Sequence, residues 1–179
     1  MRKLVIGEFL SLDGVMEAPE KWTFPYFNEE VGAHLGSSMA TSDALLLGRV
    51  TYEAFASTFS PQTGGEADTM NHLQKYVVST TLKTADWNHS TLLQGNIAEA
   101  ITALKQQPGK NIVVSGSGRL VQSLMQFGLV DEYSLLVYPI ILGAGRRLFS
   151  DGLNTSSLRL IEARPFSNGV VLLRYQPER

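Results

Sequence analysis

The middle of the chain alternates short apolar runs with longer amphipathic segments. Asn111 to Ser115 is apolar and β-branched, which is typical of a buried strand, and Gly116-Ser117-Gly118 interrupts it. A helix is expected next, ending at Gly128, because apolar residues recur at helical spacing at Leu120, Val121, Leu124 and Met125. Tyr133 to Tyr138 is a second apolar run. Strand, glycine turn, helix and strand in this order predict a parallel crossover unit.

The same patterns predict the remaining elements. They predict strands over residues 2–12, 43–47, 76–78 and 90–93, and helices over 28–39, from Thr51 through Phe55, around Met70, and from Asn96 up to Pro108. Asn28, Thr51 and Asn96 are expected to cap their helices. Two further runs, 158–163 and 170–175, flank Asn168-Gly169, which predicts an antiparallel hairpin. The sequence thus predicts one α/β domain over residues 1–179, with a mainly parallel central sheet flanked by helices and a C-terminal antiparallel hairpin.

Composition limits the partners and the cellular compartment that we expect for this domain. The net charge is -2, which argues against a nucleic-acid or anionic-membrane partner. There is no cysteine, which suits a reducing cytoplasm. Glu8 and Asp13 interrupt the apolar start of the chain, so it reads neither as a signal peptide nor as a membrane span. We expect a cytoplasmic protein.

Small, hydroxyl-bearing or basic residues follow three of the expected strands. These strand ends are Gly48-Arg49-Val50-Thr51, Ser79-Thr80-Thr81 and Gly116-Ser117-Gly118-Arg119. In open α/β sheets ligands bind at the carboxyl ends of strands, and Arg, Ser and Thr all donate to phosphate. Each turn alone is more often a tight connection or a cap, but three together favour a phosphorylated cofactor. The last turn is not the G-x-G-x-x-G fingerprint, because Val121 replaces its third glycine.

Five stretches carry a resemblance to a known family. They are SLDGVM at 11–16, DALLLGRVTYE at 43–53, VVSTT at 77–81, VVSGSGRL at 113–120 and GLVDEYSLLVYPIILGAGRRLF at 128–149. In this order they resemble the dihydrofolate reductase-like superfamily, and within it the reductase domain of the riboflavin-biosynthesis deaminase-reductases. The resemblance implies a dihydrofolate reductase-like fold over nearly the whole chain.

The resemblance also implies a set of residues that bind a nicotinamide cofactor. Gly48, Arg49, Val50 and Thr51 match the turn that holds cofactor phosphates, and Ser79 and Thr80 match the strand end beside the adenosine. The turn against the pyrophosphate and nicotinamide ribose falls on Ser115, Gly116, Ser117, Gly118, Arg119 and Leu120. If the cis peptide of the family is kept there, it joins Gly116 to Ser117. Arg49 and Arg119 both match positions that face the adenosine 2′-phosphate, so NADPH is expected rather than NADH.

The residues expected at the substrate site differ from those of dihydrofolate reductases. In their Trp-x-x-Pro-x-acid pattern the acid supports protonation of the pterin, but here Phe27 stands at that position after Trp22 and Pro25. Helical geometry turns Glu29 and Glu30 away from that face. The arginine expected to hold the folate tail is also missing, because residues 50–74 contain no Lys or Arg. Folate is therefore not the expected main substrate.

Several residues are candidates for the substrate site. Trp22, Phe27 and Tyr138 are expected to bind a flat heterocycle, although core packing explains aromatic residues there equally well. Asp13 and Glu17 are candidate proton donors, although Asp13-Gly14 also reads as a simple turn. Gly143 and Gly145 permit a tight loop beside the site. In that loop Arg146 and Arg147 either meet a substrate phosphate or are solvated. His34, His72 and His89 show no metal-ligand spacing, so no metal is expected.

The expected function is an NADPH-dependent reductase that transfers hydride to a small heterocyclic or imine-like substrate. The best named reaction, by resemblance, is that of 5-amino-6-(5-phosphoribosylamino)uracil reductase. A weak dihydrofolate reductase and a non-catalytic nucleotide-binding module are the alternatives. The apolar strands of the C-terminal hairpin are expected at a sheet edge, where a homodimer would cover them.

Overall fold

A computed structural model describes all residues from 1 to 179. Its strands are β1 (Leu4–Ser11), β2 (Ser42–Gly48), β3 (Gln74–Val78), β4 (Ser90–Leu93), β5 (Asn111–Val114), β6 (Glu132–Tyr138), β7 (Leu158–Pro165) and β8 (Val171–Pro177). Its α-helices are α1 (Glu29–Ala40), α2 (Arg49–Phe59), α3 (Gly65–His72), α4 (Ile97–Gln106) and α5 (Gly118–Gln126). Two short 3₁₀ turns, Pro19–Lys21 and Phe24–Tyr26, lie between β1 and α1.

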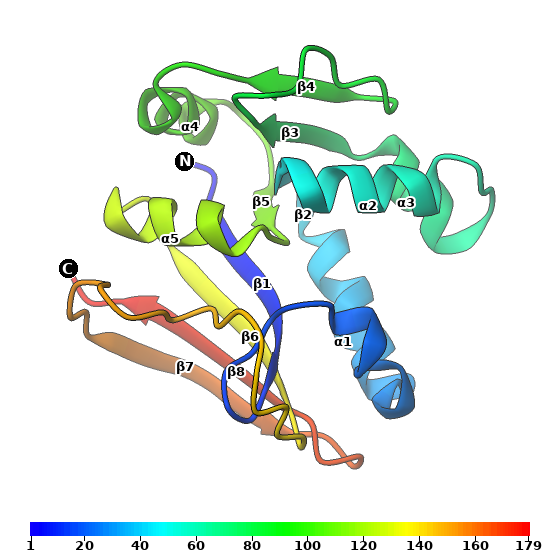
Figure 1. The fold of residues 1–179 in the computed structure, drawn as a ribbon, viewed down its shortest axis with the longest axis vertical. Helices are drawn as coiled ribbons and strands as arrows, with labels where there is room; N and C mark the ends of the chain where they lie inside the picture. Colours follow the sequence, from blue (N-terminus) through cyan, green and yellow to red (C-terminus); the bar gives the residue numbers. More distant parts are fainter.

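The strands form one eight-stranded sheet in the order β4-β3-β2-β5-β1-β6-β8-β7. The first six are parallel neighbours, whereas β8 runs antiparallel to β6 and to β7. In Figure 1, α4 and α5 lie on one side of the sheet, and α1, α2 and α3 lie on the other. The predicted fold class, a mainly parallel sheet between helices with an antiparallel C-terminal hairpin, is confirmed. No helix is long and apolar enough to span a membrane.

Local chemistry accounts for most element boundaries. The Asn28 side chain accepts a hydrogen bond from the Val31 amide at 2.9 Å, and Asn96 accepts one from the Glu99 amide at 3.2 Å, so both predicted caps are confirmed. Gly128 has a φ of 65° just after α5, as its predicted place beyond the helix requires. At the hairpin, Gly169 has a φ of 88° and closes the turn between β7 and β8.

The predicted cap at Thr51 is wrong. α2 begins at Arg49, with Gly48 as its N-cap, so Thr51 is already inside the first helical turn. The helix starts early because Gly48 ends β2 in an extended conformation and its amide donates to the Gly116 carbonyl at 3.1 Å. A partner outside the helix therefore fixes this boundary, and Thr51 is free to face the neighbouring turn.

Three hydrophobic clusters hold the layers together. The first packs α4 and α5 onto one face of the sheet around Ile6 and Val114. The second lies on the other face, under α1, and contains Tyr138 and Leu172. The third lies on the same face under α2 and α3 and contains Tyr52. The two halves of that face thus have separate cores.

The sheet divides at the carboxyl end of β5. β5 pairs with β1 only as far as Ile6, opposite Val114, and then ends. β1 continues along β6 until Ser11 lies opposite Tyr138. From Gly7 onward, the edge of β1 that faced β5 has no strand beside it. This fork lies next to the turn that leads into α5.

Candidate active site

The three strand ends that carry small, hydroxyl-bearing or basic residues lie side by side. β3, β2 and β5 are adjacent parallel strands, and Gly48 lies in register with Val78, the residue before Ser79. The Gly48 amide also donates to the Gly116 carbonyl, which joins the end of β2 to the end of β5. The structure therefore brings the predicted cofactor-binding turns to one edge of the sheet.

The turns after β2 and β5 touch so closely that only glycine fits at their contact. A Cβ atom on Gly48 would lie 2.5 Å from Ser117 Oγ, and one on Gly116 would lie 2.8 Å from Thr51 Oγ1. Gly116 also has a φ of +98°, which side-chain-bearing residues rarely adopt. The peptide between Gly116 and Ser117 is cis, as expected from the resemblance.

Two helices begin at this edge with free or weakly used amides. The N-cap of α2 is Gly48, which has no side chain to accept from the first-turn amides. Ser117 caps α5, and its hydroxyl accepts from the Leu120 amide at 3.5 Å. Arg49 is exposed at the start of α2 and forms an ion pair of 3.0 Å with Glu53. Arg119 is exposed at the start of α5. Helix amides and two guanidinium groups are suited to bind phosphate.

The third strand end contributes less to a ligand site. Ser79 is buried, and its hydroxyl oxygen accepts from the amides of Thr81 and Leu82 at 3.1 and 3.0 Å. Its side chain therefore caps the turn after β3, the simpler of the two interpretations of this residue. Thr80, the next residue, is exposed, so its hydroxyl is the one at this strand end that a ligand can reach.

The three candidate substrate-binding aromatic residues do not form one open wall. Trp22 and Tyr138 are 7% and 2% exposed, and their rings pack edge to face at 5.5 Å. They belong to the cluster under α1. Phe27 is 64% exposed and lies against Gly32 at the start of α1. Core packing therefore accounts for Trp22 and Tyr138, and Phe27 alone faces solvent.

Apolar side chains nevertheless surround the carboxyl edge of the sheet. Leu12, Val50 and Ile141 follow β1, β2 and β6 respectively, and all three are exposed. Leu12 and Ile141 lie close together, because the Leu12 amide donates to the carbonyl of Ile140 at 2.8 Å. Exposed apolar residues beside an edge that is suited to phosphate are also suited to a ligand that joins phosphates to flat organic rings.

Asp13 anchors a loop. Its carboxylate accepts from the Ser11 hydroxyl at 2.6 Å and from the Leu142 and Gly143 amides at 3.1 and 2.9 Å. These hydrogen bonds, that from Ser11 first, lower the pKa of Asp13 from 3.8 to about 2. A carboxyl group that stays ionised at neutral pH is a poor proton donor. The geometry therefore favours a structural role for Asp13.

The loop that Asp13 holds contains the predicted Gly143 and Gly145. A Cβ on Gly145 would lie 2.7 Å from Val15, so the loop packs directly on the turn after β1. Arg147 donates from Nε to the Asp13 carbonyl at 3.0 Å, and the Arg146 side chain lies against Gly118 at the start of α5. Arg146 is thus the arginine of this pair that points toward the predicted cofactor turns. Glu17 is exposed next to this loop.

Sequence reasoning missed Glu8. It lies in β1 on the same face as Leu4, Ile6 and Leu10, all of which are buried. Its Oε1 atom is fully buried without a hydrogen-bond partner, although the residue as a whole is only half-buried. Burial raises the pKa of Glu8 from 4.5 to about 8. The signal was present in the sequence, because an acid at an inward position of an apolar strand is unusual.

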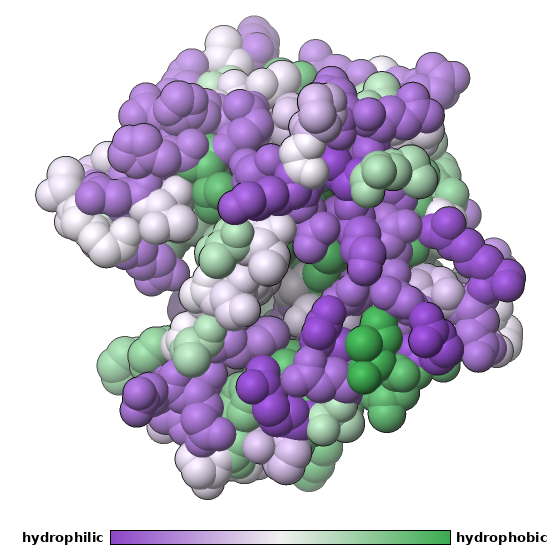
Figure 2. All heavy atoms as spheres, turned by 180° about the vertical axis from the view of Figure 1, so that it is seen from behind, coloured by the Kyte–Doolittle hydropathy of each residue, from purple (hydrophilic) through white to green (hydrophobic).

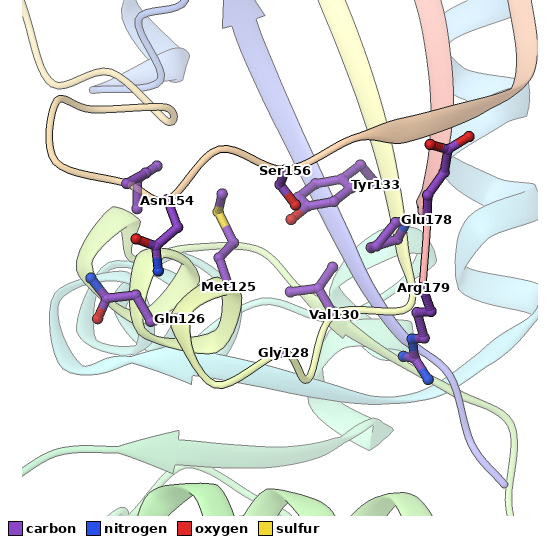
Figure 3. Close-up of a pocket in the computed structure, with 11 residues that line it drawn as sticks. Met125, Gln126, Gly128, Val130, Tyr133, Asn154, Ser156, Glu178 and Arg179 are labelled. Carbon is purple, nitrogen blue, oxygen red and sulfur yellow. The ribbon is translucent and has the colours of Figure 1, made fainter.

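A cavity of ≈ 420 Å³ lies elsewhere in the molecule. Figure 3 shows it between the end of α5, the start of β6, the segment before β7 and the C-terminus of the chain. Met125, Val130 and Tyr133 contribute apolar surface, and Glu178 and Arg179 lie at the chain end. Because α5 begins at the carboxyl edge and ends here, this cavity is at the opposite end of α5 from the predicted cofactor turns.

Comparisons with known proteins agree with this geometry. The family model described as the RibD C-terminal domain matches residues 2–172. The uncharacterized protein YyaP of Bacillus subtilis is 30% identical over 182 residues, covering 97% of this chain and 94% of YyaP.

Three solved structures share the fold at low sequence identity. A protein attributed to riboflavin biosynthesis from Shewanella sp. PV-4 is 21% identical, with a TM-score of 0.80 and 99% of both chains covered. The deaminase/5-amino-6-(5-phosphoribosylamino)uracil reductase of Thermotoga maritima has a TM-score of 0.70 at 12% identity, covering 99% of this chain and 57% of that one. Dihydrofolate reductase from Enterococcus faecalis, complexed with NADP(H), has a TM-score of 0.68 at 14% identity and covers 99% and 97%.

The pH dependence of stability tests the structural role of Asp13. Its pKa is lower in the folded protein than the ordinary 3.8, so its stabilisation is present above about pH 4 and is lost as the pH falls toward about 2. The variant Asp13→Asn lacks this contribution. We expect wild type to be more stable than the variant at neutral pH, and the two free energies of unfolding to converge in acid.

Urea unfolding from about pH 7 to about pH 2 measures this difference. Asp151→Asn, at an exposed turn, is the matched control and should follow wild type throughout. A gap between wild type and Asp13→Asn that stays constant over this pH range would contradict the anchoring role.

Proposed function

Because the chain belongs to the RibD C-terminal domain family, we propose that it is an NADPH-dependent reductase that transfers hydride to a small heterocyclic or imine-like substrate. The reaction that fits best is reduction of 5-amino-6-(5-phosphoribosylamino)uracil, the activity named for the Thermotoga maritima protein of the same fold. The observation that carries the proposal is the joining of the β2 and β5 strand ends through the contact of Gly48 with Gly116.

The residues at this edge fit a dinucleotide with several phosphates. The uncapped amides of α2 and the guanidinium of Arg49 would hold phosphate, and the exposed Arg119 adds a second cation nearby. The Gly116-Ser117 turn presents backbone without a Cβ at Gly116, so a ligand can approach it closely. Enterococcus faecalis dihydrofolate reductase, which has this fold, was solved with NADP(H).

In the proposed reaction, the protein positions the cofactor and the substrate and limits their contact with water. Once bound, the nicotinamide cofactor supplies the hydride. The turns after β2 and β5 fix the phosphates, and the fork between β5 and β1 leaves room for a ring beside the open edge of β1. The loop anchored by Asp13 packs on the turn after β1 and, with Leu12 and Ile141, limits the access of water.

Dihydrofolate is the second candidate substrate, since the fold is shared with dihydrofolate reductase. Phe27 occupies the position of the pterin-binding acid and is mostly exposed. Glu30, one of the two acids that follow it, accepts hydrogen bonds from the Ser167 hydroxyl and amide, which lower its pKa. A carboxylate held in this way is not free to pair with a pterin. These features favour the pyrimidine substrate.

Cofactor choice tests the proposal directly. NADPH should bind more tightly than NADH, because Arg49 and Arg119 can contact its additional phosphate. Arg49→Ala should remove one charge-assisted contact, worth about 1.5–3 kcal/mol, and so weaken NADPH binding about 10- to 150-fold with little change for NADH. Calorimetric titration measures both affinities.

Arg159→Ala is the matched control, because Arg159 lies on β7 and pairs with Gln176. Its affinities should equal those of wild type. Equal affinity of the wild type for NADPH and NADH would refute the assignment of the two arginines. Binding without any turnover would identify the protein as a nucleotide-binding module.

Substrate preference separates the two reductase activities. Because Phe27 replaces the acid, kcat/KM for dihydrofolate should be well below that for 5-amino-6-(5-phosphoribosylamino)uracil at saturating NADPH. Oxidation of NADPH, followed by absorbance, measures both values. A kcat/KM for dihydrofolate above about 10⁴ M⁻¹s⁻¹, within the range of ordinary enzymes, would mean that another group replaces the missing acid.

A homodimer is the assembly that the sheet edge favours. β7 is an edge strand, and its Leu160 and Ile161 are 50% and 38% exposed. In Figure 2 hydrophobic atoms reach the surface in the lower half of the molecule, at the height of β7, β8 and α1 in Figure 1. A two-fold contact would cover such an edge.

Light scattering at micromolar concentration should therefore give the mass of two chains. Ile161→Lys should shift the protein to the mass of one chain, because burying a charged lysine in an apolar contact costs free energy. A wild-type mass of one chain that does not rise with concentration would show that the monomer protects this edge by itself.

A further inference from the structure

The candidate acids of the site differ in their ability to hold a proton. Asp13 has a pKa of about 2, and its carboxylate accepts hydrogen bonds from the Ser11 hydroxyl and from the loop it anchors. The pKa of Glu30 lies below its ordinary value, because the Ser167 hydroxyl and amide donate to it. Glu17 is exposed to solvent. Their lowered pKa values make Asp13 and Glu30 poor proton donors near neutral pH.

Glu8 differs from these acids in its surroundings. No strand partner or side chain satisfies its Oε1 atom, which is fully buried. A buried polar atom without a partner is costly, and such atoms are uncommon in folded proteins. The cost is reduced if the carboxyl group stays protonated, and burial raises its pKa to about 8. At neutral pH Glu8 is therefore mostly neutral and can act as an acid.

The position of Glu8 places it at the fork. Ile6 is the last residue of β1 that pairs with β5, and Glu8 is the next residue on the same face. It therefore lies at the level where β5 has ended and the Gly116-Ser117 turn begins. α5, which starts from that turn, covers this face of the sheet. The residue is only half-buried, so part of its side chain can be reached.

We propose that Glu8 is the proton donor of the reduction, acting from the fork between β1 and β5 on the substrate as it accepts hydride. This proposal rests on the proposed function. As a C–H bond forms at the substrate carbon, the π bond of its C=N or C=O group breaks, and the electron pair passes to the nitrogen or oxygen. That atom takes the proton of the Glu8 carboxyl group, whose O–H bond breaks. The resulting carboxylate recovers a proton from solvent before the next turnover.

The neighbouring elements place few charges near Glu8. On the same face, β6 contributes Leu135 opposite Glu8 and Tyr133 two residues earlier, and α5 contributes Leu120. The charged groups of the nearest turns and loops include Arg119 on α5, Arg146 and Arg147 on the loop before β7, and Asp13 and Glu17 in the turn after β1. Burial is the sole cause of the raised pKa, so none of these charges sets it.

Tyr138 is the competing donor. Its hydroxyl lies on the opposite face of the sheet, in the cluster under α1, and burial raises its pKa to about 12. A group with that pKa is a weaker acid at neutral pH than Glu8. The variant Tyr138→Phe keeps the packed ring and removes only the hydroxyl, so it separates the two donors.

The first measurement needs no turnover. Protein with ¹³C-labelled glutamate side chains is titrated by NMR, and the Glu8 signal is assigned as the one absent from Glu8→Gln. We expect its midpoint near 8, against about 4.5 for exposed glutamates. The oxidised nicotinamide ring carries a positive charge, so the midpoint should be lower with NADP⁺ bound than with NADPH bound.

The second measurement is kinetic, with 5-amino-6-(5-phosphoribosylamino)uracil as substrate. Glu8→Gln should lower kcat about 100-fold or more, while NADPH affinity stays within about threefold of wild type. Glu8→Asp retains an acid and should recover part of the lost rate. Glu66→Gln, on the exposed face of α3, is the matched control and should behave as wild type. Tyr138→Phe should retain most of the rate.

Each outcome decides between the two proposals. If calorimetry detects no binding of either cofactor, the proposed function fails. If the cofactors bind but the Glu8 midpoint is the same with NADP⁺ and NADPH, Glu8 is remote from the ring and the proton-donor proposal alone is overturned. A wild-type kcat in Glu8→Gln, or a larger loss in Tyr138→Phe, overturns it as well. If the pyrimidine is not turned over, the NMR titration decides. A lower Glu8 midpoint with NADP⁺ than with NADPH supports the placement of Glu8 beside the nicotinamide ring, and equal midpoints overturn it.

Discussion

The contact between the turns after β2 and β5 determines the rest of the site. The Gly48 amide donates to the Gly116 carbonyl, and neither glycine could carry a Cβ without meeting Ser117 or Thr51. This contact fixes where α2 and α5 begin, and therefore where their free amides and the side chains of Arg49 and Arg119 lie. It also ends β5 early, which opens the fork beside β1. A backbone contact of this kind is stiff, because it has no rotatable side chain to adjust.

Sequence patterns predicted elements well wherever local chemistry set them. The caps at Asn28 and Asn96 and the turn at Asn168-Gly169 depend on neighbouring residues, so they were visible in the sequence. The start of α2 was misplaced because its boundary depends on Gly116, which is remote in sequence. The three strand ends were foreseen as a group, since parallel strands bring their carboxyl ends to one edge.

Side-chain roles in the substrate half were harder to foresee. Asp13 and Glu8 are both acids near the end of one strand, yet their surroundings move their pKa values in opposite directions. The Asp13 carboxylate accepts hydrogen bonds from backbone amides of a loop about 130 residues later in the chain, whereas Glu8 Oε1 has no hydrogen-bond partner. The sequence marks Glu8 as an unusual acid in an apolar strand, but the burial of Glu8 and the loop amides at Asp13 come from segments remote in sequence. Likewise, only the packed structure separates Trp22 and Tyr138, which lie in the core, from the exposed Phe27.

The two separate cores on the α1–α2 face have an evolutionary consequence. One core, under α2 and α3, supports the edge suited to a phosphorylated cofactor, and the other, under α1, supports the aromatic residues around Tyr138. Substitutions at distant sites without shared partners have nearly independent effects on stability. The α1 region can therefore accumulate substitutions while the edge formed by the turns after β2 and β5 stays intact. A fold divided in this way allows one half of this face to vary in evolution without unfolding the other.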